Sequence, residues 1–160
     1  MRHLLLLFAL AIPALAVENF DLQYGRLAAS LAGLSTQDQS AVQDAIAQIR
    51  KGDNKLALVR LSELNKENPK NSSLRILTAY ALLRTGDMIG ALDNAKQGEA
   101  YDNPDGYKCW FLAKVALLAG DAPICKREIG HAREVLKSGS KSDQELISSL
   151  KGIEKGLKKN

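Results

Sequence analysis

The chain alternates between stretches rich in apolar helix formers and short polar breaks. In AVQDAIAQIRK, SLRILTAYALLRT and YKCWFLAKVALLA, apolar residues recur three and four positions apart, as on the buried face of an α-helix. Alanine and leucine are plentiful and aromatic residues are sparse, which favours helix. No long alternation of Val, Ile and Thr is present to build a sheet. The pattern therefore predicts an all-α protein.

The breaks between these stretches repeat every 34 residues. Gly-Asp occurs at Gly52, Gly86 and Gly120, and a small residue stands seven positions before and five positions after each glycine. Glycine ends a helix because it takes a positive φ without strain, and the Asp after it can cap the next helix. The period predicts three helical hairpins in which small residues face each other: Ala45 and Ala57, Ala79 and Ala91, Ala113 and Cys125.

These units resemble a known family. A 34-residue helix–turn–helix with paired small residues, a Gly-Asp turn and closing prolines (Pro69 and Pro104) is similar to the tetratricopeptide repeat, or TPR. The resemblance covers three units within residues 36–139. It implies a TPR-like helix-hairpin solenoid, which is a right-handed superhelix of about seven helices. The units span 38–71, 72–105 and 106–139.

The first unit departs most from the family pattern. The family favours leucine eight residues before the turn glycine, where this chain has Asp44, Thr78 and Leu112. It also favours a large apolar residue four before the glycine, where the first unit has Gln48. Solenoids tolerate departures from the repeat consensus at their ends, so we interpret the first unit as an N-terminal end repeat.

Both flanks of the repeat region have a predicted form. Residues 140–160 contain an amphipathic helix that covers the exposed end of the solenoid, with Ser142 and Glu145 as a capping box. Its apolar stripe consists of Leu146, Leu150, Ile153 and Leu157. Residues 17–35 are either a loose arm or a short helix that packs on the first repeat.

The first sixteen residues, MRHLLLLFALAIPALA, have the layout of a secretory signal peptide. A basic start is followed by an apolar run and by Ala14-Leu15-Ala16, an A-x-A cleavage site before Val17. The run is shorter than the roughly 20 residues needed to span a bilayer, and no lipoprotein cysteine follows it. The expected mature protein is periplasmic or secreted and has no stable membrane span.

Charge and motifs exclude several classes of function. The formal net charge of +4 is modest, and much of the excess lies in the C-terminal tail, so we expect no nucleic-acid partner. No phosphate loop, zinc pattern or nucleophile elbow is present. His131 is the only histidine after the leader, and a lone helical histidine is usually a packing or surface residue. The sequence therefore predicts no enzyme activity, cofactor or metal.

The two cysteines, Cys109 and Cys125, leave two alternatives. In a secreted chain they suggest one disulfide, since Cys109 lies one helical turn before Ala113, the residue opposite Cys125. The spacing is near the geometric limit for a bridge, so two buried free thiols are the other alternative.

The resemblance also implies a binding surface. In TPR solenoids the first helices of the hairpins line a concave groove, and Arg50 and Arg84 are placed to flank it here. Tyr107, Trp110 and Phe111 cluster at its far end, where the alternative is that they pack between hairpins or under the C-terminal helix. The predicted groove residues are Val42, Gln43, Ile46 and Ile49, then Ile76, Leu77, Tyr80 and Leu83, and finally Trp110, Phe111, Lys114 and Leu117.

These observations predict a non-catalytic scaffold or adaptor that holds a peptide or helix of another protein in its groove. The alternative function is a structural subunit of a larger envelope assembly, which docks through its end helices or self-associates.

Overall fold

The computed structural model describes residues 24–100, 105–136 and 140–158, and the predicted signal peptide lies outside these residues. Seven helices of 13 to 17 residues account for most of the described chain, which contains no strand. The predicted all-α hairpin fold is therefore confirmed. Two short elements, η1 (Tyr24–Arg26) and α2 (Ala28–Leu31), come first. The long helices are α3 (Thr36–Lys51), α4 (Asn54–Glu67), α5 (Ser72–Thr85), α6 (Met88–Ala100), α7 (Gly106–Leu118), α8 (Ala122–Val135) and α9 (Lys141–Leu157).

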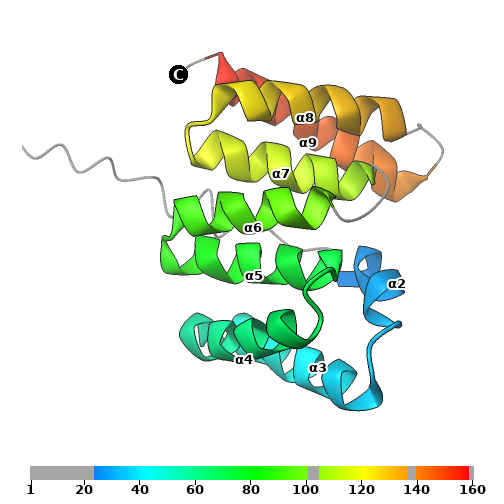
Figure 1. The fold of residues 1–160 in the computed structure, drawn as a ribbon. Helices are drawn as coiled ribbons and strands as arrows, with labels where there is room; N and C mark the ends of the chain where they lie inside the picture. The colour runs from blue at the N-terminus through cyan, green and yellow to red at the C-terminus, as the bar shows by residue number, and fades with distance from the viewer. Residues whose placement is uncertain (1–23, 101–104, 137–139, 159–160) are drawn as a thin grey trace, which may run out of the picture.

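The long helices form three hairpins, α3–α4, α5–α6 and α7–α8, stacked in chain order (Figure 1). Neighbouring hairpins meet where the second helix of one packs against the first helix of the next, as α4 does on α5 and α6 on α7. Helix α9 packs on α7 and α8 and covers that end of the stack, whereas α3 and α4 form the opposite end. The described stack therefore has one capped end and one end without a further helix layer.

Each hairpin turns at its predicted glycine. Gly52, Gly86 and Gly120 have φ of 89°, 87° and 76°, in the left-handed region that glycine favours, which confirms the prediction. Asp87 and Asp121 then cap the next helix, because their carboxylates accept from backbone N–H groups at 2.9 and 3.0 Å. Asp53, the third residue of this set, makes no such hydrogen bond with its side chain.

The predicted small residues lie in the core. All six are fully buried, at the lines where the helices of each hairpin meet: Ala45, Ala57, Ala79, Ala91, Ala113 and Cys125. A second close approach occurs at Gly98, where a Cβ atom would lie 3.0 Å from Ile76 Cδ1 and 3.1 Å from the Ser72 carbonyl oxygen. Helices α5 and α6 therefore need small side chains at both places.

A buried polar link joins the first two repeats. Asn65 Nδ2 donates to Thr78 Oγ1 at 2.8 Å and to the Leu61 carbonyl oxygen at 2.9 Å, and Thr78 Oγ1 donates to the Leu74 carbonyl oxygen at 2.8 Å. Thr78 is one of the positions where the sequence departs from the leucine that the TPR pattern favours. Its hydroxyl has a partner in the neighbouring repeat, which explains how a polar residue is accommodated there.

The termini differ from the prediction in two respects. Helix α9 is capped by Ser140, whose hydroxyl accepts from the Asp143 N–H at 3.0 Å, so Ser142 is not the N-cap residue. The short helix α2 is present, as one of the two alternatives had it, but it packs mainly on α5 of the second repeat. The Ser142 hydroxyl accepts from Arg26 of the N-terminal segment at 2.6 Å.

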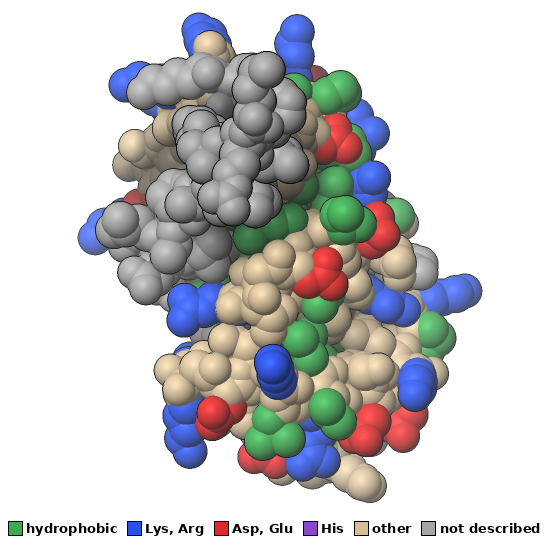
Figure 2. Space-filling model, turned by 90° about the vertical axis from the view of Figure 1, so that its left-hand side faces the viewer, with side chains coloured by type: hydrophobic (Ala, Val, Ile, Leu, Met, Phe, Trp, Pro, Cys, Tyr) green, Lys and Arg blue, Asp and Glu red, His purple; other side chains and the backbone are tan. Residues whose placement is uncertain are grey.

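The described surface shows no single dominant charge on the face seen in Figure 2. There, Lys and Arg side chains are interspersed with Asp and Glu side chains outside the grey region. Of the helices in the described ranges, none combines the length and apolar character that crossing a membrane requires.

Candidate protein-binding groove

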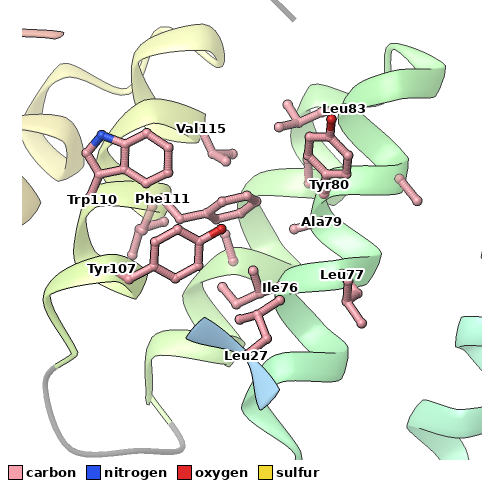
Figure 3. Packing of buried hydrophobic residues seen from close by; sticks show 14 of the residues in the cluster. Leu27, Ile76, Leu77, Ala79, Tyr80, Leu83, Tyr107, Trp110, Phe111 and Val115 are labelled. Atoms are coloured by element: carbon pink, nitrogen blue, oxygen red, sulfur yellow. The ribbon is translucent and has the colours of Figure 1, made fainter. Parts of the chain in front are cut away.

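Most of the predicted groove residues of the second and third repeats are core residues. Ile76, Leu77 and Phe111 are fully buried, and Tyr80 and Trp110 have only 7% and 6% of their surface exposed to solvent. Figure 3 shows Phe111 between the two repeats, with Tyr107 and Ile76 on one side and Tyr80 beyond it. These apolar residues are placed to hold helices together and present little surface to a partner. The interpretation of this stretch as an open groove is corrected accordingly.

One reason for this burial is the N-terminal segment, residues 24–34. Leu27 is fully buried and lies beside Ile76 (Figure 3). The segment is fixed to the start of α5: Ser73 Oγ donates to the Leu27 carbonyl oxygen at 3.1 Å, Ser30 Oγ donates to Ser73 Oγ at 2.5 Å, and Asn71 Nδ2 donates to the Ser30 carbonyl oxygen at 2.9 Å. The N-terminal segment thus covers part of α5.

Arg26 extends this attachment to the other end of the molecule. Its guanidinium donates to Ser142 Oγ at 2.6 Å and to Asp143 Oδ1 at 2.7 Å, and it lies over the Tyr107 ring at 5.9 Å. Hydrogen bonding by Arg26, and then by Ser140, holds the pKa of the Asp143 carboxyl below its ordinary value. The N-terminal segment is therefore bound to α5, α7 and α9 together.

Trp110 lies under the C-terminal helix. Its indole Nε1 donates to Ser149 Oγ of α9 at 3.0 Å, and its ring stacks on Tyr107 with centroids 5.5 Å apart. Of the two alternatives for the aromatic cluster, the structure supports packing under the C-terminal helix. Lys114, one turn further along α7, is only partly buried, and burial lowers the pKa of its ammonium group.

The first repeat retains an open groove. A hollow of about 260 Å³ lies between α2 and α3. Four of the five residues predicted in this repeat line it, whereas Ile49 is a buried core residue outside it. Its walls are Leu31, Ala32, Gln39, Val42, Gln43, Ile46 and Arg50. Val42 and Ile46 form its apolar floor and expose only 1% and 4% of their surface. The accessible surface of the hollow therefore comes mainly from its other lining residues, with Gln43 and Arg50 exposed at the edge.

The spacing of these groove residues is that of one helix face. Positions 39, 43, 46 and 50 follow one another at intervals of four, three and four, and position 42 lies three after 39 and four before 46, so all five belong to one stripe along α3. Helix α3 packs mainly on α4, which leaves this stripe without a covering helix in the described chain. Leu31 and Ala32 were not predicted, because the fold of the N-terminal segment brings them to the groove, and Gln39, in the first turn of α3, was not in the predicted set either. Gln39 Nε2 fixes that segment by donating to the Leu34 carbonyl oxygen at 2.9 Å.

Arg84 lies elsewhere. It borders a separate hollow at the first hairpin turn, together with Gly52, Lys55 and Leu56. Arg50 is therefore the one of the two predicted flanking arginines that lines the α2–α3 groove.

The cysteines are both buried free thiols. Cys109 faces the second half of α8, where its sulfur lies close to Glu128 and His131, one turn beyond Cys125. Burial, followed by the charge of Glu128 and Glu99, raises the pKa of the Cys109 thiol to about 12. The sequence did not reveal this cluster, because its residues come from three helices. The one local indication was the three-residue spacing of Glu128 and His131.

Comparison with known proteins supports the fold. No family model and no curated protein matches the chain. Among solved structures, the chain is similar to SycD, the type III secretion translocator chaperone of Yersinia enterocolitica, with a TM-score of 0.65 and 16% sequence identity. The match covers 80% of this chain and 90% of the SycD chain. At this identity the likeness shows a shared TPR-like helical-hairpin fold.

Proposed function

We propose that the chain is a non-catalytic adaptor that binds a segment of another protein in the α2–α3 groove. The observation that carries this proposal is the stripe on α3, which has an apolar floor and a polar edge and no helix over it. An apolar centre with a polar rim is the usual anatomy of a protein-binding site. The likeness to a secretion chaperone supports a protein partner as opposed to a small substrate.

The size of the groove favours a short anchor. About 260 Å³ is less than the usual volume of a small-molecule site, but it can receive one or two apolar side chains. A helix or extended peptide would place such side chains against Val42 and Ile46, while Gln43 and Arg50 bind its polar groups. Arg50 is suited to a carboxylate or a backbone carbonyl because its guanidinium is a multiple donor.

We further propose that the adaptor works in the periplasm or outside the cell. The support is the layout of residues 1–16, with a cleavage site before Val17. Intact-mass spectrometry of the protein from its native source is expected to give a chain that begins at or near Val17. Soluble protein that retains Met1 would contradict the export part of the proposal and leave the groove untouched.

A groove variant tests the binding proposal. Gln43→Arg adds bulk and charge at the edge of the groove without changing the core, because Gln43 is exposed. Gln97→Arg on α6 is the matched control, since Gln97 is also exposed on a helix and lies outside the groove. In affinity capture from the native source, we expect a partner that binds the unmodified chain and the control but is reduced at least tenfold with Gln43→Arg. Equal recovery with both variants would contradict the proposal.

The alternative, a structural subunit of a larger assembly, has its own observation. Leu56 and Val59 on α4 and Ile89 on α6 are large apolar residues with 57%, 59% and 77% of their surface exposed. They lie on the second helices of the hairpins, outside the α2–α3 groove. A partner lost on Val59→Ser but retained on Gln43→Arg would favour this alternative.

A further inference from the structure

Four metal-ligating side chains meet between the second and third repeats. They are Glu99 at the end of α6, Cys109 in α7, and Glu128 and His131 in α8. One ligand atom from each lies within 4.8 Å of those of the others. Across the described ranges, this is the one place where three or more His, Cys, Asp or Glu side chains converge in this way. The sequence separation of these residues shows that the packing of three helices creates the cluster.

The Glu128 carboxylate is the central feature of this cluster. It is fully buried, and its Oε1 accepts from Arg127 Nε at 2.6 Å. Its Oε2 has no hydrogen-bond partner and lies 3.4 Å from His131 Nδ1. A buried carboxylate oxygen without a donor is costly, because water is removed and nothing replaces it. A carboxylate oxygen of Glu128 lies within 4.8 Å of the other three ligand atoms, and a cation bound among them would satisfy Oε2.

The donor atoms indicate the kind of cation. Thiolate, imidazole and carboxylate together are typical of zinc, whereas calcium and magnesium prefer oxygen ligands alone. In a tetrahedral zinc site the ligand atoms are about 3.3–3.8 Å apart, given the usual zinc–ligand distances. The four ligand atoms lie within 4.8 Å of one another, and Glu128 Oε2 is 3.4 Å from His131 Nδ1, so side-chain rotation that draws the other atoms closer would complete the site. A cation would also offset the negative charge of the Glu99 and Glu128 carboxylates, of which Glu128 is paired with Arg127.

We propose that Glu99, Cys109, Glu128 and His131 bind one Zn²⁺ ion that ties α6, α7 and α8 together. Cys109 and Glu128 are buried ligands, and Glu99 and His131 are partly exposed, so the ion has access from the surface. All four ligands come from the protein, which is the arrangement of a structural zinc site. The ion would hold the third repeat on the second in a fixed register. This proposal does not depend on the groove, because the two sites lie in different repeats.

Cobalt titration of the untagged, chelator-treated chain tests the site. We expect one Co²⁺ per chain, a thiolate-to-cobalt charge-transfer band in the near ultraviolet, and displacement of the cobalt by Zn²⁺. Cys109→Ala is expected to abolish the band. Cys125→Ala is the matched control and should retain it, since the equivalent positions in the other repeats are already Ala57 and Ala91. A missing band in the unmodified chain, or a band that survives Cys109→Ala, would overturn the proposal.

Two further variants test the site at positions where substitution is not expected to unfold the protein. Glu99→Gln and His131→Gln change partly exposed side chains, so both variants are expected to keep the helical circular-dichroism spectrum. Each is expected to weaken Zn²⁺ binding at least tenfold in a chelator competition. Zn²⁺ should raise the melting temperature of the unmodified chain and of Cys125→Ala, and much less that of His131→Gln. The same zinc affinity in His131→Gln and the unmodified chain would show that the cluster is not a metal site.

Discussion

At the scale of single residues, the turn glycines give the sharpest prediction. Gly86→Ala is expected to destabilise the protein by about 1–2 kcal/mol, since a side chain at φ of 87° is strained. A Cβ there would meet nothing within 4 Å, so the cost is conformational and not steric. Gly130→Ala is the matched control, because it lies inside α8 with equally open surroundings and should stabilise by about 0.5–1 kcal/mol. Urea unfolding of both variants measures the difference, and a Gly86→Ala variant as stable as the parent would contradict the turn geometry.

The thiols give a second prediction at this scale. Burial raises the pKa of Cys109 to about 12 and also raises the pKa of Cys125, where Asp121 adds to the effect. A raised thiol pKa means less thiolate at a given pH, so alkylation in the native state at pH 8 should be slow for both residues. Under denaturing conditions without reductant, we expect two reactive thiols per chain. Finding none would show that the cysteines are bridged.

The sequence predicted well the residues whose role depends on their own backbone or size. The positive φ of Gly86 and the burial of Ala79 follow from turn chemistry and from the repeat period. The pairing of Thr78 with Asn65 could not be predicted in this way, because it depends on how two repeats meet. For the same reason, the sequence suggested that His131 was an ordinary surface or packing residue and did not indicate its three neighbours.

At the scale of helices, the N-terminal segment is expected to detach in acid. The lowered pKa of Asp143 means that its bond to Arg26 stabilises the docked segment fully above the ordinary carboxyl pKa of 3.8. This contribution is lost as the pH falls through the lower pKa of the folded state. Hydrogen exchange of residues 24–34, corrected for the intrinsic effect of pH, should therefore accelerate in that range.

Asp143→Asn separates this effect from general acid unfolding. The variant should show faster exchange of the N-terminal segment at neutral pH, with exchange in α5 and α7 unchanged. Identical exchange in the variant and the parent would show that the Arg26 contact does not hold the segment.

Trp110 gives the second prediction for the helices. Because Trp110 is buried against Tyr107 and bound to Ser149, Trp110→Ala should cost about 3–5 kcal/mol of stability. Gln43→Ala, on the exposed edge of the groove, should change stability by no more than about 0.5 kcal/mol. Thermal unfolding compares the two. An unchanged melting temperature for Trp110→Ala would show that packing does not depend on Trp110, and the residue would again be a candidate for partner binding.

The helices were predicted correctly, whereas the groove was predicted too long, and this difference has a physical cause. Helices and turns follow from local spacing, so the 34-residue period predicts the hairpins. The burial of Ile76 and Phe111 depends partly on a segment far away in the chain: Arg26 reaches Asp143 across 117 positions. No periodicity encodes such a contact, and so the predicted groove was longer than the one that the structure leaves open.

At the scale of the whole molecule, the two ends of the stack differ. The end with α7, α8 and α9 is covered, and the N-terminal segment is bound to α5 and α9. The end with α2 and α3 keeps a hollow open, in which Gln43 and Arg50 are exposed at the edge of a floor formed by Val42 and Ile46. This asymmetry favours partner binding at the first repeat, although its sequence departs most from the TPR pattern.

Site-specific photo-crosslinking in the native host would show where the partner binds. A photoreactive residue would replace Gln43 in the groove or, as a control, Gln97 on α6, both of which are exposed. We expect a discrete protein adduct from position 43, suppressed by excess unmodified chain, and no such adduct from position 97. No adduct from position 43, or the same adducts from both positions, would contradict the assignment of the α2–α3 groove as the binding site.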